Sequence, residues 1–247
     1  GGTHSDIVVP NLAAMFESLQ PAGRWSRDQV EEALREAIVA LPVYRTYLDP
    51  EHDESGETDH NLTLKALDLA RTRAHVDQSL FETLGRLILD PDGAHERAFV
   101  LAFQQYTGPA MAKGGEDTAF YRYNRLVALN EVGANPGRWG NSLDAFHALC
   151  AQNAERWPST MLTLSTHDTK RGADLRMRIA ALSENPDEWA ATVRGWMARH
   201  EGLRELGPDA NDAYLLYQTL AGAWPIDEDR VREYMLKAVR EAKRHTT

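Results

Sequence analysis

Apolar residues recur every three or four positions along most of the chain, and this helical period constrains the fold more than any other feature. Ser26 and Gln29 have the spacing of a capping box, which marks the start of a helix. The apolar face of that helix continues at Val30, Leu34, Ile38 and Leu41. Similar patterns predict helices at about 61–89, 94–105, 143–155, 187–206, 209–221 and 227–243. The sequence therefore predicts a mainly α protein.

The charge balance limits the classes of partner. A formal net charge of −10 and a pI of about 5.4 describe an acidic surface, which repels phosphate groups. We therefore expect no nucleic acid and no membrane as a partner, whereas a neutral sugar is compatible with this charge. The single cysteine, Cys150, cannot form an internal disulfide, which favours a cytoplasmic protein. Its helical apolar setting predicts a buried thiol rather than a nucleophile.

Two segments interrupt the helical pattern. Residues 49–60 hold six acidic side chains and no aliphatic one, so a solvated loop is favoured over a metal site built on His52 and His60. Residues 106–140 show no clean helical period until about 120–131, and they mix aromatic with charged side chains. Long irregular segments of this kind are commonly functional.

The stretch LTLSTHDTKR, residues 162–171, concentrates chemical groups after an apolar run. We expect a strand at 161–165 and a helix at 172–182, with His167 and Asp168 between them, as at the strand ends where barrel enzymes place catalytic residues. Helix capping by Asp168 is the alternative, but it does not explain the cations Lys170 and Arg171, which the helix dipole opposes. An ionised carboxylate held by cations can accept hydrogen bonds from sugar hydroxyls and support an oxocarbenium-like transition state.

Two long motifs then carry a resemblance that extends over essentially the whole chain. GPAMAKGGEDTAFYRYNRLVALNEVG and RWPSTMLTLSTHDTKRGADLRMRIAALSE resemble the maltooligosyltrehalose synthases, which are members of the α-amylase-like glycoside hydrolase clan. ALPVYRTYL, AGAWP and KAVREAKRHTT fit the same family. The resemblance implies an intramolecular transglycosylation without a cofactor, in which a reducing-end α-1,4 linkage of a maltooligosaccharide becomes an α,α-1,1 linkage. The activity implied is that of an isomerase of trehalose biosynthesis.

The resemblance also assigns roles to residues. STHD resembles the clan's fourth motif, so Asp168 is expected to stabilise the transition state and His167 to contact the sugar. The remaining expected substrate-binding residues are Lys170, Arg171 and Tyr121, together with Lys113, Glu116, Asp117 and Arg122, for which a role in loop structure is the alternative. Glu131 is expected to be structural. No credible match to the family's nucleophile or general acid is found in residues 1–160.

The missing carboxylates indicate that the chain is an internal piece of a larger enzyme, and that it is inactive alone. Its first residues, Gly1 to His4, contain no initiator Met and no signal-peptide pattern, which fits this view. We expect a helical domain at 1–105, then a loop-rich sugar-site segment and partial barrel end at 106–247, with one or two short strands. The rest of the barrel would be its partner.

Two other functions stay open at this stage. The chain can be a helical module for carbohydrate binding or domain packing, without chemistry of its own. It can also belong to an α-1,4-glucan hydrolase of the same clan, with the same role for Asp168.

Overall fold

The computed structural model describes residues 4–21, 23–49, 56–203 and 207–244 of the 247. These residues form helices, turns and irregular segments, and none of them forms a strand. The expectation of a mainly α protein is therefore confirmed, whereas a partial barrel is not shown. The chain divides into two compact units, Gly1–Gly115 and Glu116–Thr247.

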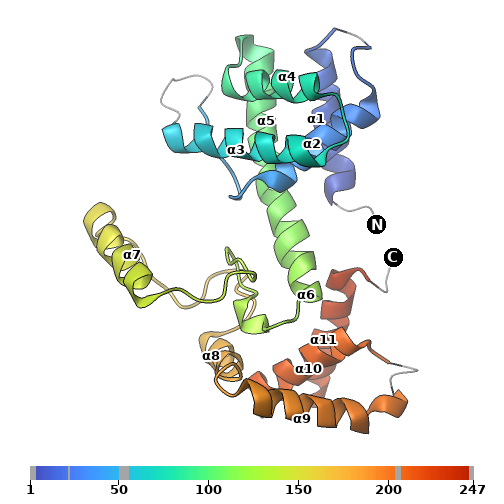
Figure 1. Ribbon diagram of the computed structural model, residues 1–247, viewed down its shortest axis with the longest axis vertical. Helices are drawn as coiled ribbons and strands as arrows, with labels where there is room; N and C mark the ends of the chain where they lie inside the picture. Colours follow the sequence, from blue (N-terminus) through green and yellow to red (C-terminus); the bar gives the residue numbers. More distant parts are fainter. Residues whose placement is uncertain (1–3, 22, 50–55, 204–206, 245–247) are drawn as a thin grey trace. The chain divides into compact units, whose positions relative to one another are not determined.

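In the part of the chain that the structure describes, the first unit is a bundle of five helices (Figure 1), which surround one apolar core. Its helices are α1 (His4–Ser18), α2 (Arg27–Ala40), α3 (Glu57–Arg73), α4 (Gln78–Leu89) and α5 (Gly93–Met111). Helix α2 packs on α1 and α3, and α5 packs on α1, α2 and α4. Phe16, Leu84 and Phe99 are fully buried in this core. At the start of α2, Ser26 and Gln29 form the predicted capping box.

The prediction of one long helix at 61–89 is wrong, because the structure contains two helices there. Helix α3 ends at Arg73, and α4 begins at Gln78. Asp77 caps the second helix, since its carboxylate accepts a hydrogen bond from the backbone N–H of Ser79 at 2.9 Å. Side-chain capping satisfies a backbone donor that the first turn of a helix leaves free, so a break at this position costs little. The predicted end of the helical stretch at residue 89 is confirmed, because α4 ends at Leu89.

Within its described residues, four helices form the body of the second unit. α10 (Ala210–Ala223) packs against α8 (Ala173–Ala181), α9 (Pro186–Arg199) and α11 (Glu228–Ala242). Ile179 of α8 and Leu215 of α10 are fully buried in the core. Gly222 permits the close approach of α10 to α8, because a Cβ atom at this glycine would lie 2.6 Å from Cγ1 of Ile179.

The segment before these helices differs from the prediction at both ends. Helix α5 continues into a π-helix, η1 (Ala112–Ala119), where irregular chain was expected. The helix expected at 120–131 is reduced to α6 (Phe120–Arg122) and a short 3₁₀ turn, η2 (Val127–Leu129). The side-chain amide of Asn130 donates to the carbonyl groups of Phe120 and Tyr123, and Gln218 accepts from the N–H of Val127. These side-chain contacts replace helical hydrogen bonds.

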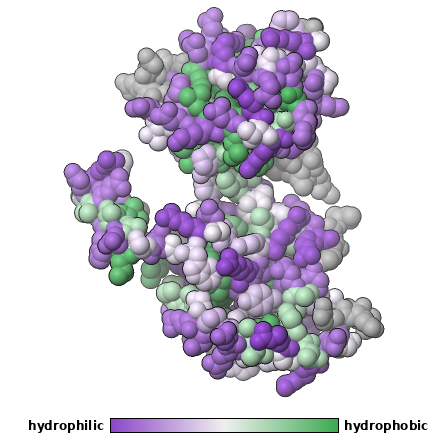
Figure 2. Space-filling model, in the orientation of Figure 1, coloured by the Kyte–Doolittle hydropathy of each residue, from purple (hydrophilic) through white to green (hydrophobic). Residues whose placement is uncertain are grey.

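The segment from α7 (Leu143–Arg156) to residue 168 is exposed. No residue of α7 is buried, and hydrophobic side chains lie on its surface (Figure 2). Cys150 is exposed, so its predicted burial is wrong. The segment expected to be a strand, 161–165, has no strand hydrogen bonds, and Met161 and Leu162 are 94% and 88% exposed. A strand needs a neighbouring strand for its backbone groups, and the described residues offer none.

Candidate functional site

A tight turn at 166–169 presents the two residues expected at the centre of the site. The backbone N–H of Thr166 donates to Oγ1 of Thr169 at 2.7 Å, and the N–H of Thr169 donates to the carbonyl of Thr166 at 3.3 Å. Asp168 has a φ of 65°, which lies in the left-handed region. Aspartate tolerates this conformation better than most residues, and such backbone positions are frequent at functional sites.

The side chains of the turn face solvent. His167 is 99% exposed and Asp168 is 72% exposed, and Nε2 of His167 lies 3.8 Å from Oδ1 of Asp168. The Asp168 carboxylate can therefore accept hydrogen bonds from an incoming ligand without first breaking a strong internal contact. The imidazole beside it can donate or accept, depending on its protonation.

The cations that follow the turn contact groups other than the Asp168 carboxylate. Lys170 pairs with Asp117, with its Nζ atom 2.8 Å from Oδ1 of that carboxylate. Burial lowers the pKa of Lys170, but the hydrogen bond to Asp117 and the charge of that carboxylate, with smaller contributions from Tyr121 and Glu116, together raise the pKa above its ordinary value. Lys170 is therefore a charged anchor between the turn and η1.

Arg171 is buried and binds three oxygen atoms of its own unit. Its guanidinium donates to the carbonyl groups of Val127 and Asn130 and to the hydroxyl of Tyr234, at 3.1, 3.4 and 2.9 Å. Tyr121 lies in the adjoining core, where burial and the nearby Tyr234 raise the pKa of its hydroxyl. These contacts give Arg171 a role in holding the turn.

The other sequence-predicted residues lie in different surroundings. Glu116 is buried, and its carboxylate accepts a hydrogen bond from the N–H of Gly133 at 3.2 Å. Arg122 donates to the last carbonyl groups of α11, those of Ala242 and Lys243. A cation at this end of a helix satisfies carbonyls that have no helical partner. Lys113 lies in η1, on the part of the chain that belongs to the first unit.

The structure thus brings together His167, Asp168, Lys170, Arg171 and Asp117 around one turn. Glu131 was expected to be structural, but the sequence did not predict that it holds this turn. The carboxylate of Glu131 accepts from the backbone N–H groups of both Lys170 and Arg171. The LNEVG motif around Glu131 is the only sequence signal of this role, and a motif does not reveal which backbone groups a carboxylate binds.

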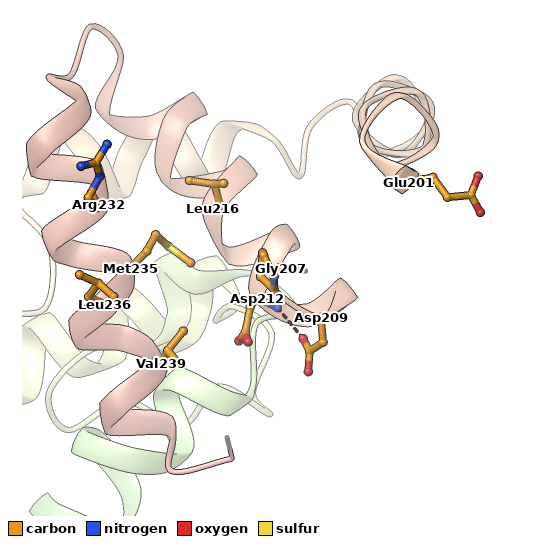
Figure 3. Close-up of a pocket in the computed structure, with 10 residues that line it drawn as sticks. Glu201, Gly207, Asp209, Asp212, Leu216, Arg232, Met235, Leu236 and Val239 are labelled. Carbon is orange, nitrogen blue, oxygen red and sulfur yellow. Dashed lines mark hydrogen bonds between the residues drawn. The ribbon is translucent and has the colours of Figure 1, made fainter. Parts of the chain in front are cut away.

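A large hollow in the second unit lies elsewhere. A cavity of about 940 Å³ is lined mainly by residues of α10 and α11 and of the loop before α10, including Asp209, Asp212, Arg232 and Met235 (Figure 3). Its lining contains none of the residues expected from the sequence. Cavity size alone therefore does not locate the candidate site.

Among the residues that the structure describes, neither a metal-ligating cluster nor a membrane-spanning helix is found. No group of three or more His, Cys, Asp or Glu in this part of the chain is arranged to hold a metal ion, and His52 of the acidic loop lies outside it. Within the same residues, no helix is long and apolar enough to cross a membrane.

The chain is similar to several solved and curated proteins, although no family model matches it. It is 36% identical to the maltooligosyltrehalose synthase of Arthrobacter ramosus, with a TM-score of 0.76 over 96% of this chain and 28% of that one. It is 32% identical to a Sulfolobus tokodaii protein described as a hypothetical maltooligosyl trehalose synthase, with a TM-score of 0.66 over 100% of this chain and 32% of that one. A curated Mycobacterium tuberculosis protein is 43% identical over 151 residues, which is 58% of this chain and 19% of the relative.

These relatives are all described as synthases of one kind, and each is several times longer than the matched span. The chain covers about a fifth of the curated relative and about three tenths of the solved ones. The curated relative carries the name "putative maltooligosyl trehalose synthase". The resemblance seen in the motifs is therefore confirmed: the chain is a homologue of one part of the maltooligosyl trehalose synthases.

Proposed function

We propose that this chain supplies part of the sugar site of an enzyme that isomerises the reducing end of maltooligosaccharides. The reaction converts the terminal α-1,4 linkage into an α,α-1,1 linkage by retaining intramolecular transglycosylation, in trehalose biosynthesis. The exposed carboxylate of Asp168, on a turn in left-handed conformation, carries this proposal. The names of the relatives support the same activity.

Asp168 has the role of transition-state stabiliser in this proposal. An ionised carboxylate can accept hydrogen bonds from two adjacent sugar hydroxyls at once. It also favours the positive charge that develops on a sugar ring in an oxocarbenium-like transition state. His167, beside it, contacts a hydroxyl of the same sugar.

The other residues contribute mainly through the shape of the site. Lys170 and Arg171 are engaged with protein oxygens, so their contribution to sugar binding is to hold the turn. Asp117 and Tyr121 support these two cations. Glu116, Arg122 and Lys113 stay candidates for direct substrate contact.

The chemistry needs groups from outside this chain. A retaining mechanism requires a nucleophile and a general acid in addition to Asp168. We propose that further polypeptide supplies them as the rest of an α-amylase-like barrel in a cytoplasmic enzyme. The exposed apolar side chains of α7 and of residues 161–164 support this proposal, because such surfaces mark interaction sites.

Titration of the chain with maltopentaose, followed by backbone NMR, tests the role of Asp168. We expect weak binding with shifts centred on residues 166–171, and Asp168→Asn should weaken it at least about tenfold, since a hydrogen bond to a charged group contributes about 1.5–3 kcal/mol. Asp144→Asn, at an exposed position on α7, is the matched control and should bind as the parent does.

Two results would count against the proposal. Equal affinity of the Asp168→Asn variant and the parent chain would remove Asp168 from the sugar site. Formation of a trehalose-terminated product by this chain alone would show that no further catalytic groups are needed.

A further inference from the structure

We propose that Glu131 and Arg176 together act as positioning residues for Asp168, by fixing the backbone on both sides of its turn. We call this pair the Glu131–Arg176 clamp. The link to sugar binding rests on the function proposed above, whereas the clamp itself is argued from geometry alone.

The turn needs an external anchor because its own side chains provide little. His167 and Asp168 face solvent, and the side-chain hydrogen bonds of Thr163, Thr166 and Thr169 join neighbouring residues of the turn to one another. The orientation of the Asp168 carboxylate is therefore set by the backbone that enters and leaves the turn.

Glu131 holds the backbone that leaves the turn. Its Oε1 atom accepts from the N–H of Lys170 at 2.8 Å, and its Oε2 atom accepts from the N–H of Arg171 at 3.3 Å. Oε1 also accepts from the N–H of Val132 at 2.9 Å, which fixes the carboxylate itself. The side chain is only 14% exposed. One carboxylate therefore orders two consecutive peptide groups directly after Thr169.

Arg176 holds the backbone that enters the turn. Its Nη2 atom donates to the carbonyl of Leu164 at 2.8 Å, across twelve residues of sequence. Its Nη1 atom lies 3.6 Å from Oε2 of Glu131. Arg176 is on α8, whose buried Ile179 ties the helix to the core. The two charged side chains thus join the residues before and after Asp168 through a single ion pair.

The chemistry of the clamp requires a carboxylate at position 131. Both oxygens accept hydrogen bonds, and one of them also faces a guanidinium. A glutamine keeps one acceptor but places an –NH₂ donor against another donor. Glu131→Gln therefore preserves size while breaking one side of the clamp. Arg176→Lys keeps the charge but removes the fork that reaches two partners at once.

Amide hydrogen exchange on the 247-residue chain tests the clamp. In Glu131→Gln, the amides of Lys170 and Arg171 should exchange at least about tenfold faster, which equals about 1.4 kcal/mol. The ³J(HN–Hα) coupling of Asp168 should also move toward a conformational average. Glu228→Gln is the matched control, because Glu228 forms an exposed ion pair with Arg232 on α11 at 2.9 Å.

Arg176→Lys covers the case in which Glu131→Gln fails to fold, and it should loosen the same turn from the other side. In the double variant, the two effects should be less than additive, because either change breaks the same clamp. Unchanged exchange and coupling in both single variants would overturn the proposal. Equal loss of protection in α10 would overturn it too, since it would indicate a general structural role.

Maltopentaose affinity then separates the clamp from the sugar site. If the parent chain binds, Glu131→Gln should weaken binding several-fold while the protection of α10 stays unchanged. If the parent chain does not bind, the exchange results still decide whether the clamp exists. Failure of the proposed function is therefore distinguishable from failure of the clamp.

Discussion

Alanine at Gly222 should destabilise the second unit, although alanine is a better helix former than glycine. Gly222 lies inside α10, and a Cβ atom there would meet Cγ1 of Ile179 at 2.6 Å and the carbonyl oxygen of Leu175 at 3.3 Å. Real Cβ atoms do not approach carbon so closely, so α8 has to move away from α10. Overpacking of this kind costs about 1–3 kcal/mol.

Gly195 provides the matched control within the same unit. It lies inside α9, and an added Cβ atom would meet nothing within 4 Å. Gly195→Ala should therefore show only the gain in helix propensity, about 1 kcal/mol. The same gain applies to Gly222→Ala, where it offsets part of the steric cost. We expect a net loss of about 0–2 kcal/mol at Gly222, and a gap of about 1–3 kcal/mol between the two variants.

Urea unfolding of the second unit measures this gap. Five of the six tryptophans lie in residues 116–247, so tryptophan fluorescence in a Trp25→Phe background reports this unit. The separate signal matters because a chain with two units need not unfold in one step. If Gly222→Ala is as stable as Gly195→Ala, the close contact between α8 and α10 is refuted. A second check is Ile179→Ala, which removes the atoms that the new Cβ would meet. The double variant Gly222→Ala/Ile179→Ala should then be more stable than the sum of the two single effects predicts.

Two further predictions concern the first unit. Urea unfolding, monitored through the NMR signals of α4, measures both. Leu84→Ala should cost about 2–5 kcal/mol because Leu84 is fully buried, whereas Leu69→Ala, at a site that is 42% exposed, should cost less than about 1 kcal/mol. Equal losses would contradict the described core. The hydrogen bonds from Arg86 lower the pKa of Glu96. This pair should therefore stabilise the unit at pH values above the ordinary glutamate pKa of about 4.3. The stabilisation should be lost as the pH falls through the lower pKa that Glu96 has in the folded state. Glu96→Gln should flatten this acid dependence, and an unchanged slope would contradict the pairing.

Short-range signals in the sequence predicted a large part of the fold. The capping box at Ser26 depends on residues three positions apart, and it is present as predicted. The break at Asp77 was accessible in principle, because Asp is a favoured N-cap residue. It was missed because Leu80 and Leu84 continue the apolar period of the preceding helix across the break.

Long-range contacts explain what the sequence did not predict. The segment at 120–131 has helical periodicity, but Gln218, 91 residues away from Val127, takes the backbone N–H that a helix would use. Arg171 presents a similar case. It was expected to contact the sugar substrate, and the structure directs its guanidinium to the carbonyl oxygens of Val127 and Asn130. No local pattern reports a partner that is supplied by a distant part of the chain.

The two sides of the Asp168 turn differ in how much of their support lies within this chain. After the turn, Glu131 and the side-chain contacts of Lys170 and Arg171 fix the backbone. Before the turn, the carbonyl of Leu164 has its contact with Arg176, while the apolar side chains at 161–164 are exposed. Burial of a large apolar side chain contributes about 1.5–3 kcal/mol, so packing of these residues against further polypeptide would favour association strongly. Under the proposed function, packing of residues 161–164 against the rest of the barrel would fix the backbone before Asp168. Arg176 would then connect that backbone to helix α8.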